Sequence, residues 1–274
     1  MNILFFNQDD ILPLNNGRKL YTSQFLNIMH KENDLTIVKF FSNIESNIHE
    51  EDLEGDKLLC ISLTSNKLLP KKRLYKKYLS FFTYKTHYET NMYIRNIKEK
   101  IENIISEKEP DLLIFNHIMT AWVLKYFLKD SNIPILYIAH NAESFAMKSI
   151  EERVVNSFFE KLFYKINYYK TRILEFNILR NSNFCTVLTD EDAERIKSLS
   201  LFPFVYTIPP IFYSSNRSLD IVIDNKTLLL VGSFSWLPKR HNALWLANKV
   251  FPKVLEKYPK AILKIVGLEA NKIK

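Results

Sequence analysis

The sequence predicts an α/β protein with a doubly wound parallel sheet, followed by the start of a second domain of the same type. The first observation is that short apolar runs alternate with helical patterns from the first residue onward. The second is that these runs are continuously apolar, which is typical of parallel strands covered by helices on both faces. The third is that a Pro- and Ser-rich stretch, Ile208–Asp220, interrupts the alternation once, after which it restarts.

The first domain is predicted from strands and helices that follow one another over roughly two hundred residues. The predicted strands are Asn2–Asn7, Leu35–Phe41, Lys57–Leu63, Asp111–Phe115, Ile133–Ala139, Asn183–Thr189 and Phe204–Ile208. The predicted helices between them are Lys19–His30, Tyr88–Ser106, Ala121–Lys129, Glu151–Leu179 and Asp190–Leu199.

A second domain begins after the interruption, with strands at Thr227–Phe234 and Ala261–Gly267 and a helix near His241–Lys257. Two apolar strands and one helix cannot bury both faces and both edges of a parallel sheet. We therefore expect either a fragment of a longer chain or a sheet that something else covers. The predicted division is a first domain at residues 1–208, a linker at 209–220 and an incomplete second domain at 221–274.

The composition favours a soluble protein of the cytosol. The 274 residues are 47% hydrophobic and 14% aromatic, which supports a buried core. The two cysteines, Cys60 and Cys185, lie in apolar runs, so we expect reduced, buried thiols and a cytoplasmic location. The N-terminus has no basic leader, and no apolar stretch approaches the length of a membrane span.

The net charge of +8 raises the question of an anionic partner. Lysine is abundant throughout the chain and no nucleic-acid-binding module is visible, so we expect no nucleic acid partner. One region, Lys67–Lys85, sets many cations beside aromatic residues and leucines. It is either a solvated loop and helix face or a surface that docks on the anionic inner membrane or a polyanionic acceptor.

The strongest candidate site is the stretch IAHNAES at Ile138–Ser144, which follows an apolar strand. It brings a histidine, an amide and a carboxylate together at His140, Asn141 and Glu143. An ordinary polar turn would have the same composition. In doubly wound sheets, however, ligands bind outside the carboxyl ends of the strands, and this position favours a functional site.

Two other positions fall at the same edge. His117 follows the strand Asp111–Phe115, and Gly17 opens the first helix, with Arg18 next to it. The free N–H groups of a helix start and its positive dipole end can bind an anion, although a tight turn into the helix explains Gly17 equally well.

Several familiar chemistries are not supported. The chain has no G-x-G-x-x-G fingerprint, no P-loop, no G-x-S-x-G elbow and no zinc-ligand spacing. Asp190 and Asp192 could chelate a metal, but with Thr189 they read better as a capped helix start. We expect neither a metal nor a cofactor.

Four stretches, in the right order, resemble the bacterial glycosyltransferases of the GT-B fold, specifically the retaining family 4 group that makes surface polysaccharides. They match an opening strand, loop and helix-start glycine, a His-Asn-x-Glu segment, a long helix carrying a glutamate, and the first βαβ unit of a donor-binding domain. The stretches are MNILFFNQDDILPLNNGRKLYTSQFL, HNAES, RILEFNILRNSNFCTVLTDEDAERI and LLLVGSFSWLPKRHNALWLANKVFPKVLEKYPKAILKIVG.

The resemblance implies two Rossmann-like domains, with the acceptor on the first and a nucleotide-sugar donor on the second. Gly17 matches the backbone position near the donor phosphates, and His140 matches the histidine that faces the transferred sugar. Gly232 and Ser233 match the loop after the first strand of the donor domain. Lys239 or Arg240, a little further along the chain, would supply the positive charge that binds the phosphates.

The implied reaction is retaining transfer of a sugar to a cell-surface polysaccharide or lipid-linked acceptor. Helix N-termini and cations would stabilise the leaving diphosphate without a metal. The chain departs from the family in having one glycine in its opening loop, where two are common, and none after Ile208–Pro209. The family's paired glutamates would lie beyond Lys274, so we expect the 274-residue chain alone to be inactive. The alternative is a non-catalytic module that binds a glycan or a protein.

Overall fold

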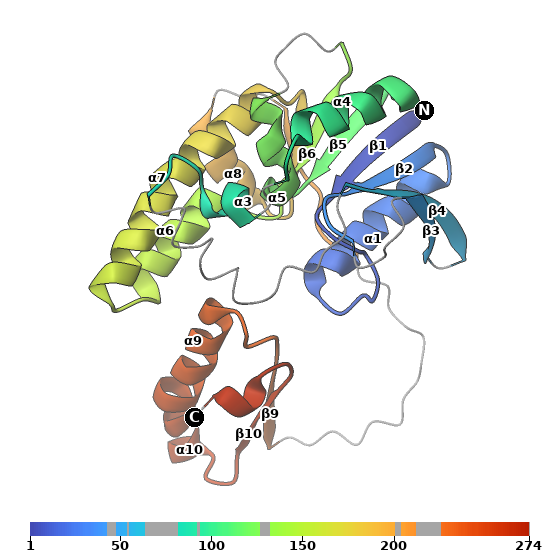
Figure 1. The fold of residues 1–274 in the computed structure, drawn as a ribbon. Helices are drawn as coiled ribbons and strands as arrows, with labels where there is room; N and C mark the ends of the chain where they lie inside the picture. Colours follow the sequence, from blue (N-terminus) through green and yellow to red (C-terminus); the bar gives the residue numbers. More distant parts are fainter. Residues whose placement is uncertain are drawn as a thin grey trace. The chain divides into compact units, whose positions relative to one another are not determined.

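Eight strands form the main sheet of the computed structural model, in the order β3-β4-β2-β1-β5-β6-β7-β8 (Figure 1). All neighbours pair in parallel except β3 and β4, which are antiparallel. The strands are β1 Asn2–Asn7, β2 Asp34–Lys39, β3 Ile48–Leu53, β4 Asp56–Ser62, β5 Leu112–Asn116, β6 Ile135–Ile138, β7 Phe184–Val187 and β8 Val205–Thr207. The structure describes residues 1–42, 48–53, 55–63, 82–91, 94–126, 132–200, 204–211 and 226–273.

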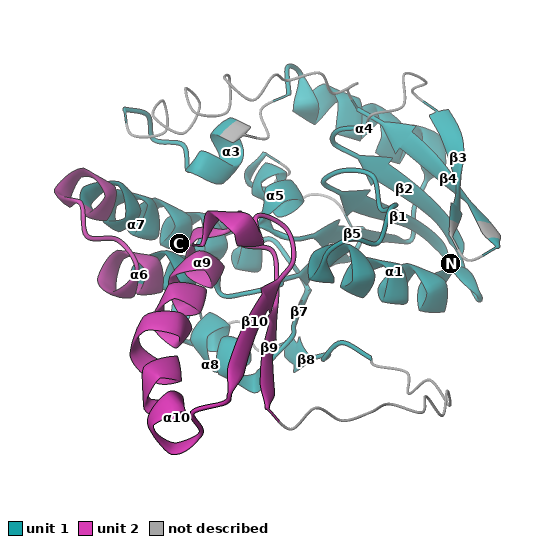
Figure 2. Ribbon diagram, turned by 90° about the horizontal axis from the view of Figure 1, so that it is seen from below, with its two compact units in different colours: residues 1–148, 162–212 teal, residues 149–161, 213–274 magenta. Residues whose placement is uncertain are grey.

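The chain divides into two compact units (Figure 2). Unit 1 comprises residues 1–148 and 162–212 and contains the eight-stranded sheet, and unit 2 comprises residues 149–161 and 213–274. The predicted linker at 209–220 lies mostly outside the described residues, as does most of Lys67–Lys85, together with the docking surface predicted there. In the described part of the chain, every helix is too short or too polar to cross a membrane.

Helices alternate with the strands of the main sheet. They are α1 Gly17–His30, α3 His87–Asn91, α4 Ile97–Lys108, α5 Ile118–Ala121, α6 Glu143–Arg153, α7 Phe158–Arg180 and α8 Asp190–Leu199. A 3₁₀ turn at Trp122–Lys125 extends α5. This alternation confirms the predicted doubly wound α/β fold.

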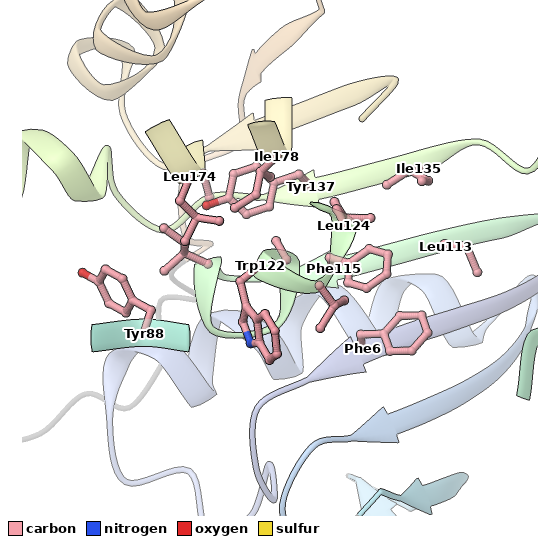
Figure 3. Packing of buried hydrophobic residues seen from close by; sticks show 14 of the residues in the cluster. Phe6, Tyr88, Leu113, Phe115, Trp122, Leu124, Ile135, Tyr137, Leu174 and Ile178 are labelled. Carbon is pink, nitrogen blue, oxygen red and sulfur yellow. The ribbon is translucent and has the colours of Figure 1, made fainter. Parts of the chain in front are cut away.

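The core lies on both faces of the sheet, because successive residues of a strand point to opposite sides. In β1, Phe5 packs with Tyr21 and Leu26 of α1 on one face. On the other face Phe6 stacks on Phe115, with ring centroids 4.4 Å apart. Figure 3 shows the second cluster, in which residues of β1, β5 and β6 meet α7 and the turn after α5; they include Phe6, Phe115, Tyr137, Trp122, Leu174 and Ile178.

Two predicted helices are each broken in two. The expected helix Glu151–Leu179 is wrong as a single element, because α6 begins earlier, at Glu143, and the chain leaves the helical path between Arg153 and Phe158. The expected helix Tyr88–Ser106 is divided into α3 and α4, and Asn96 adopts a left-handed conformation (φ 55°) just before α4 begins. Asparagine tolerates this conformation better than most residues, which explains the break there.

Unit 2 contains the parallel pair β9 (Thr227–Val231) and β10 (Ile262–Val266), with Leu229 beside Lys264 in register. The helical segment between them consists of α9 (Leu237–Trp245), a π-helical turn (Leu246–Val250) and α10 (Phe251–Lys257). Pro252 has no N–H to donate to the preceding turn, which accounts for the widened helix in front of it. Leu229 and Val231 are exposed, as expected for a sheet that few elements cover.

Candidate functional site

Polar side chains meet at the carboxyl ends of three neighbouring strands of unit 1. Asn7 ends β1 and Asn116 ends β5, and β5 pairs with both β1 and β6. His117 and His140 lie just past the ends of β5 and β6, so the sheet itself brings them together. Their imidazole rings have centroids 5.3 Å apart. The predicted convergence of His117 and His140 at one sheet edge is therefore present in the structure.

Three amide and hydroxyl groups connect this edge to α1. Nδ2 of Asn116 donates to Oδ1 of Asn7 at 2.8 Å and to Oγ1 of Thr22 at 2.9 Å. Nδ2 of Asn7 in turn donates to the backbone carbonyl of Asp9 at 2.7 Å. All three side chains, Asn7, Thr22 and Asn116, are buried. The network fixes the position of α1 against the ends of β1 and β5.

His140 is held neutral at this edge. Its Nε2 lies 2.7 Å from Oδ1 of Asn116, while its ring meets Tyr21 edge-on at 5.3 Å. Burial is the main reason that the pKa of His140 falls to about 3, and the neighbouring His117 and Arg18 lower it further. Within the described part of the chain, Nδ1 has no hydrogen-bond partner, and the residue is 8% exposed. In His140, Nε2 is thus hydrogen-bonded within the protein, whereas Nδ1 is free to bind a ligand.

His117 and Glu143 form a second buried group beside His140. Nδ1 of His117 accepts from the N–H of Met119 at 3.2 Å, so the proton lies on Nε2, which donates to Oε1 of Glu143 at 3.1 Å. His117 has φ 72°, an uncommon conformation for a residue other than glycine. Tyr88 O–H donates to Oε2 of Glu143 at 2.6 Å. The contacts of both side chains are internal.

Glu143 is therefore a fully hydrogen-bonded carboxylate. Burial alone would raise its pKa, but hydrogen bonds from His117, Tyr88 and Asn141 outweigh burial and bring the pKa to about 2. Asn141, which is exposed, donates to Oε1 of Glu143 at 3.1 Å. The carboxylate ties α3, the end of β5 and the start of α6 together. Of the four predicted residues at this edge, Asn141 is the exposed one.

A second carboxyl group, Glu175 of α7, caps the start of α6. Its two oxygens accept from the backbone N–H of Glu143 at 2.6 Å and of Ser144 at 3.1 Å. These N–H groups have no partner within the helix, so Glu175 supplies one. Burial, with the charge of Glu143 added, raises the pKa of Glu175 to about 8. Sequence reasoning missed this role, because nothing near Glu175 in the sequence shows which helix start it would reach.

The two carboxyl groups predict an unusual dependence of stability on pH. Glu175 keeps its proton in the folded protein up to about pH 8 but loses it near pH 4.5 when unfolded, so its contribution to the free energy of unfolding should fall as pH rises through that window. Glu143 acts in the opposite sense, and its contribution is lost as pH falls from 4.5 to about 2. Below about pH 6.5 the buried, neutral His140 contributes in the opposite sense to Glu175, so Glu175→Gln should flatten the slope in urea denaturation between about pH 6.5 and pH 8.

The matched control is Glu160→Gln, which changes an exposed glutamate near the start of the same helix. It should leave the slope as in the parent protein. A Glu175→Gln protein whose stability still falls over this pH window would contradict the assignment of the proton to Glu175.

The helix start at Gly17 is open, but its neighbouring cation is engaged. A Cβ built on Gly17 would meet nothing within 4 Å, so no packing demands a glycine there. Asn16 caps α1 by accepting from the N–H of Lys19 at 3.0 Å. Nη2 of Arg18 lies 3.0 Å from both carboxylate oxygens of Asp9. To bind a phosphate, Arg18 would have to break its ion pair with Asp9 or bind Asp9 and the phosphate together.

A buried lysine supports the loop after β1. Nζ of Lys39 lies 3.1 Å from Oδ1 of Asp10 and 2.6 Å from Oε2 of Glu51. The Lys39 side chain is 0% exposed. Ser42 also donates to Asp10, at 2.8 Å. Because Asp10 follows Asp9, this ion pair fixes the segment that holds Arg18.

In unit 2, Gly232 and Ser233 lie between β9 and α9, whereas Lys239 and Arg240 lie in the first turn of α9. Oγ of Ser233 is 2.9 Å from Oγ of Ser235. Arg240 is bound internally, since it donates to the carbonyl of Phe234 at 3.1 Å and to Glu269 at 3.2 Å. Lys239 is exposed, and it has no ion-pair partner within the described residues. Of the two cations that the sequence left open, Lys239 is the available one.

Gly232 lies under the loop that follows β10. A Cβ built on Gly267 would come within 1.9 Å of the Gly232 carbonyl oxygen, and Gly267 has φ +136°. The N–H of Gly232 donates to Val266 at 3.0 Å. The two loops at the carboxyl ends of β9 and β10 thus depend on glycine for their close approach.

The Asp190–Asp192 pair is a helix start, as predicted. The Thr189 hydroxyl accepts from the N–H of Asp192 at 3.1 Å, and Asp192 accepts the Thr189 hydroxyl at 3.0 Å. Asp190 accepts from Thr207 at 2.6 Å. Among the described residues, His, Cys, Asp and Glu side chains form no group of three or more that could hold a metal ion.

Asn116 is the site residue that sequence reasoning missed most clearly. The available signal was its position, because it ends an apolar strand directly before His117. Asn7 ends β1 in the same way. A polar residue that closes an apolar strand is thus a useful indicator of a sheet edge that carries a site.

No protein-family model matches the sequence, and no curated protein is significantly similar to it. Solved structures do resemble it. Sucrose-phosphate synthase from Thermosynechococcus elongatus matches with a TM-score of 0.62 and 14% identity, over 97% of this chain and 70% of that chain. Arabidopsis thaliana UGT89C1 complexed with UDP-L-rhamnose has a TM-score of 0.49 and 12% identity, over 97% and 69%. At such identities the likeness shows the fold alone, which is the Rossmann-like GT-B fold found in glycosyltransferases such as sucrose-phosphate synthase.

Proposed function

We propose that the chain is a nucleotide-sugar-dependent glycosyltransferase of the retaining type, acting on a cell-surface polysaccharide or a lipid-linked acceptor. One observation carries this proposal. His140 presents an open nitrogen on a neutral imidazole at the carboxyl edge of a Rossmann-like sheet, which is where such sheets bind ligands. The GT-B fold supports the same reaction class.

The chemistry of His140 suits a sugar better than a phosphate. With Nε2 hydrogen-bonded to Asn116 and the ring uncharged, Nδ1 can only accept a hydrogen bond. A sugar hydroxyl can donate to it, whereas a phosphate oxygen without a proton cannot. We assign His140 to the transferred sugar, with Asn141 beside it as an exposed amide.

The diphosphate would be held by other groups. In unit 1, the open start of α1 at Gly17 offers free N–H groups to a phosphate. Unit 2, taken by itself, offers the exposed Lys239, which has no ion-pair partner among the described residues. As the bond to the sugar breaks, negative charge grows on the leaving diphosphate, and fixed N–H groups and cations stabilise it. This assignment requires no metal. Both cysteines are free and buried, which supports a cytoplasmic enzyme.

The proposal is tested by isothermal titration of UDP-, GDP- and ADP-sugars into the chain. One donor should release heat, and His140→Ala should weaken its binding about tenfold, the cost of one lost hydrogen bond. His30→Ala is the matched control, since His30 ends α1 about 20 Å from the helix start. Equal binding by the parent protein and His140→Ala would refute the role of His140.

A positive turnover result would distinguish the enzyme from a non-catalytic module. Release of free nucleotide in the presence of a lipid-linked or polysaccharide acceptor would support the transferase. Donor binding without any release is the result expected both of a sugar-binding module and of the 274-residue chain alone. The anomeric proton of the product, read by NMR, distinguishes retention from inversion.

A further inference from the structure

The orientation of the Asn116 side chain at the proposed site is fixed by its hydrogen bonds. Asn116 is 1% exposed, and its amide makes three hydrogen bonds of 2.7 to 2.9 Å to three different elements. A neutral amide has two donors and one acceptor oxygen, so its partners reveal how it is oriented.

The orientation follows from the neighbours. Asn7 donates from Nδ2 to the carbonyl of Asp9, which can only accept, so Oδ1 of Asn7 must face Asn116. Asn116 must then present Nδ2 to Asn7, because two oxygens facing each other would repel. Its own Oδ1 is left facing His140 at 2.7 Å. The network therefore assigns the His140 proton to Nε2.

We propose that Asn116 is a positioning residue that fixes the tautomer and orientation of His140, so that Nδ1 is presented to the ligand as a hydrogen-bond acceptor. This inference rests on the proposed function only in identifying the ligand as a sugar. A carboxylate in place of Asn116 would instead favour the charged imidazolium. The neutral amide supports an uncharged acceptor.

The surroundings of His140 also favour an uncharged imidazole. The groups that affect its charge are His117, whose ring lies 5.3 Å away, Arg18 and Glu143, and Tyr21 makes an edge-to-face contact with the ring. Burial is the largest influence, and the neighbouring His117 and Arg18 also lower the pKa of His140, while Glu143 raises it. None of these groups selects between the two nitrogens. Among the residues that the structure describes, the hydrogen bond to Asn116 is the contact that does so.

The first test uses the unmodified protein. In a ¹⁵N-histidine-labelled sample, long-range ¹H–¹⁵N spectra should show His140 as the neutral Nε2–H tautomer throughout the range from about pH 5 to pH 8. His140→Ala assigns the signal. A His140 signal of the Nδ1–H tautomer, or one that titrates near its ordinary pKa, would overturn the proposal without any Asn116 variant.

The second test is Asn116→Asp. The carboxylate beside Nε2–H should raise the pKa of His140 by about one to three pH units. Asn167→Asp is the matched control, since Asn167 is an equally buried amide whose bonds go to Phe163 and His87. An unchanged His140 titration in Asn116→Asp, or an equal change in both variants, would contradict the positioning role.

Donor titration keeps this inference separable from the proposed function. In Asn116→Asp, sugar binding should weaken as the pH falls through the new pKa of His140, because a protonated Nδ1 cannot accept. If no donor binds to the parent protein while its spectra show the Nε2–H tautomer, the glycosyltransferase proposal fails and the role of Asn116 stands.

Discussion

Replacing Lys39 by methionine is expected to lower the free energy of unfolding of unit 1 by about 3–5 kcal/mol. Methionine keeps much of the buried stem but removes the ammonium from between Asp10 and Glu51, whose side chains are 13% and 11% exposed. Both carboxylates would lose their buried countercharge. Burial lowers the pKa of Lys39, but its bonds to Glu51 and Asp10 raise it overall, so the full loss should appear at neutral pH.

Urea denaturation at pH 7 measures this loss, with Lys57→Met as control. Lys57, on the adjacent strand β4, pairs with Glu50 at 3.4 Å, but both side chains are mostly exposed, at 74% and 61%. Such surface pairs contribute about 0–1 kcal/mol. Similar small losses in the two variants would show that the Lys39 ion pair does not stabilise the fold. Because Asp10 adjoins Asp9, Lys39→Met should also loosen Arg18.

Replacing Gly267 by alanine is expected to destabilise unit 2 by at least about 3 kcal/mol. Two causes add. An alanine at φ +136° is strained, and its Cβ would lie 1.9 Å from the Gly232 carbonyl oxygen, which is backbone and cannot rotate away. The loops that follow β9 and β10 would have to separate. Unit 2 should then unfold at lower denaturant concentration than unit 1.

Tryptophan fluorescence can follow unit 2 alone. The chain has three tryptophans, of which Trp236 and Trp245 belong to unit 2 and Trp122 to unit 1. A Trp122→Phe background leaves the unit 2 signals. Gly17→Ala is the control, because the added Cβ has open space and alanine is favoured over glycine in a helix by up to about 1 kcal/mol of free energy. Unchanged unfolding of unit 2 in Gly267→Ala would refute the predicted clash.

The fold could be predicted from the sequence where apolar content decides it. β1 shows why: Leu4 and Phe6 bury on one face while Ile3 and Phe5 bury on the other, so a continuously apolar run signals a sheet covered twice. The same reasoning located the strands of both units. It missed β3, since a strand at a sheet edge needs little apolar content.

The site was predictable only in part. Position after a strand identified His117 and His140, because parallel strands deliver their carboxyl ends to one edge. The partners that determine their chemistry come from far along the chain. Tyr88 lies 55 residues from Glu143, and Glu175 lies 32 residues from it. Local patterns contain no information on such pairs, so the sequence could indicate a site but not the charge state of its groups.

The antiparallel strand β3 also bears on how this protein meets other copies of itself. An unpaired edge strand exposes N–H and C=O groups that can recruit a strand from another chain. β3 ends the sheet with the acidic run Glu50, Glu51 and Asp52, and Glu50 is largely exposed. At the opposite end, β8 is only three residues long. Among the described strands of unit 1, both margins therefore oppose edge-to-edge pairing with another copy.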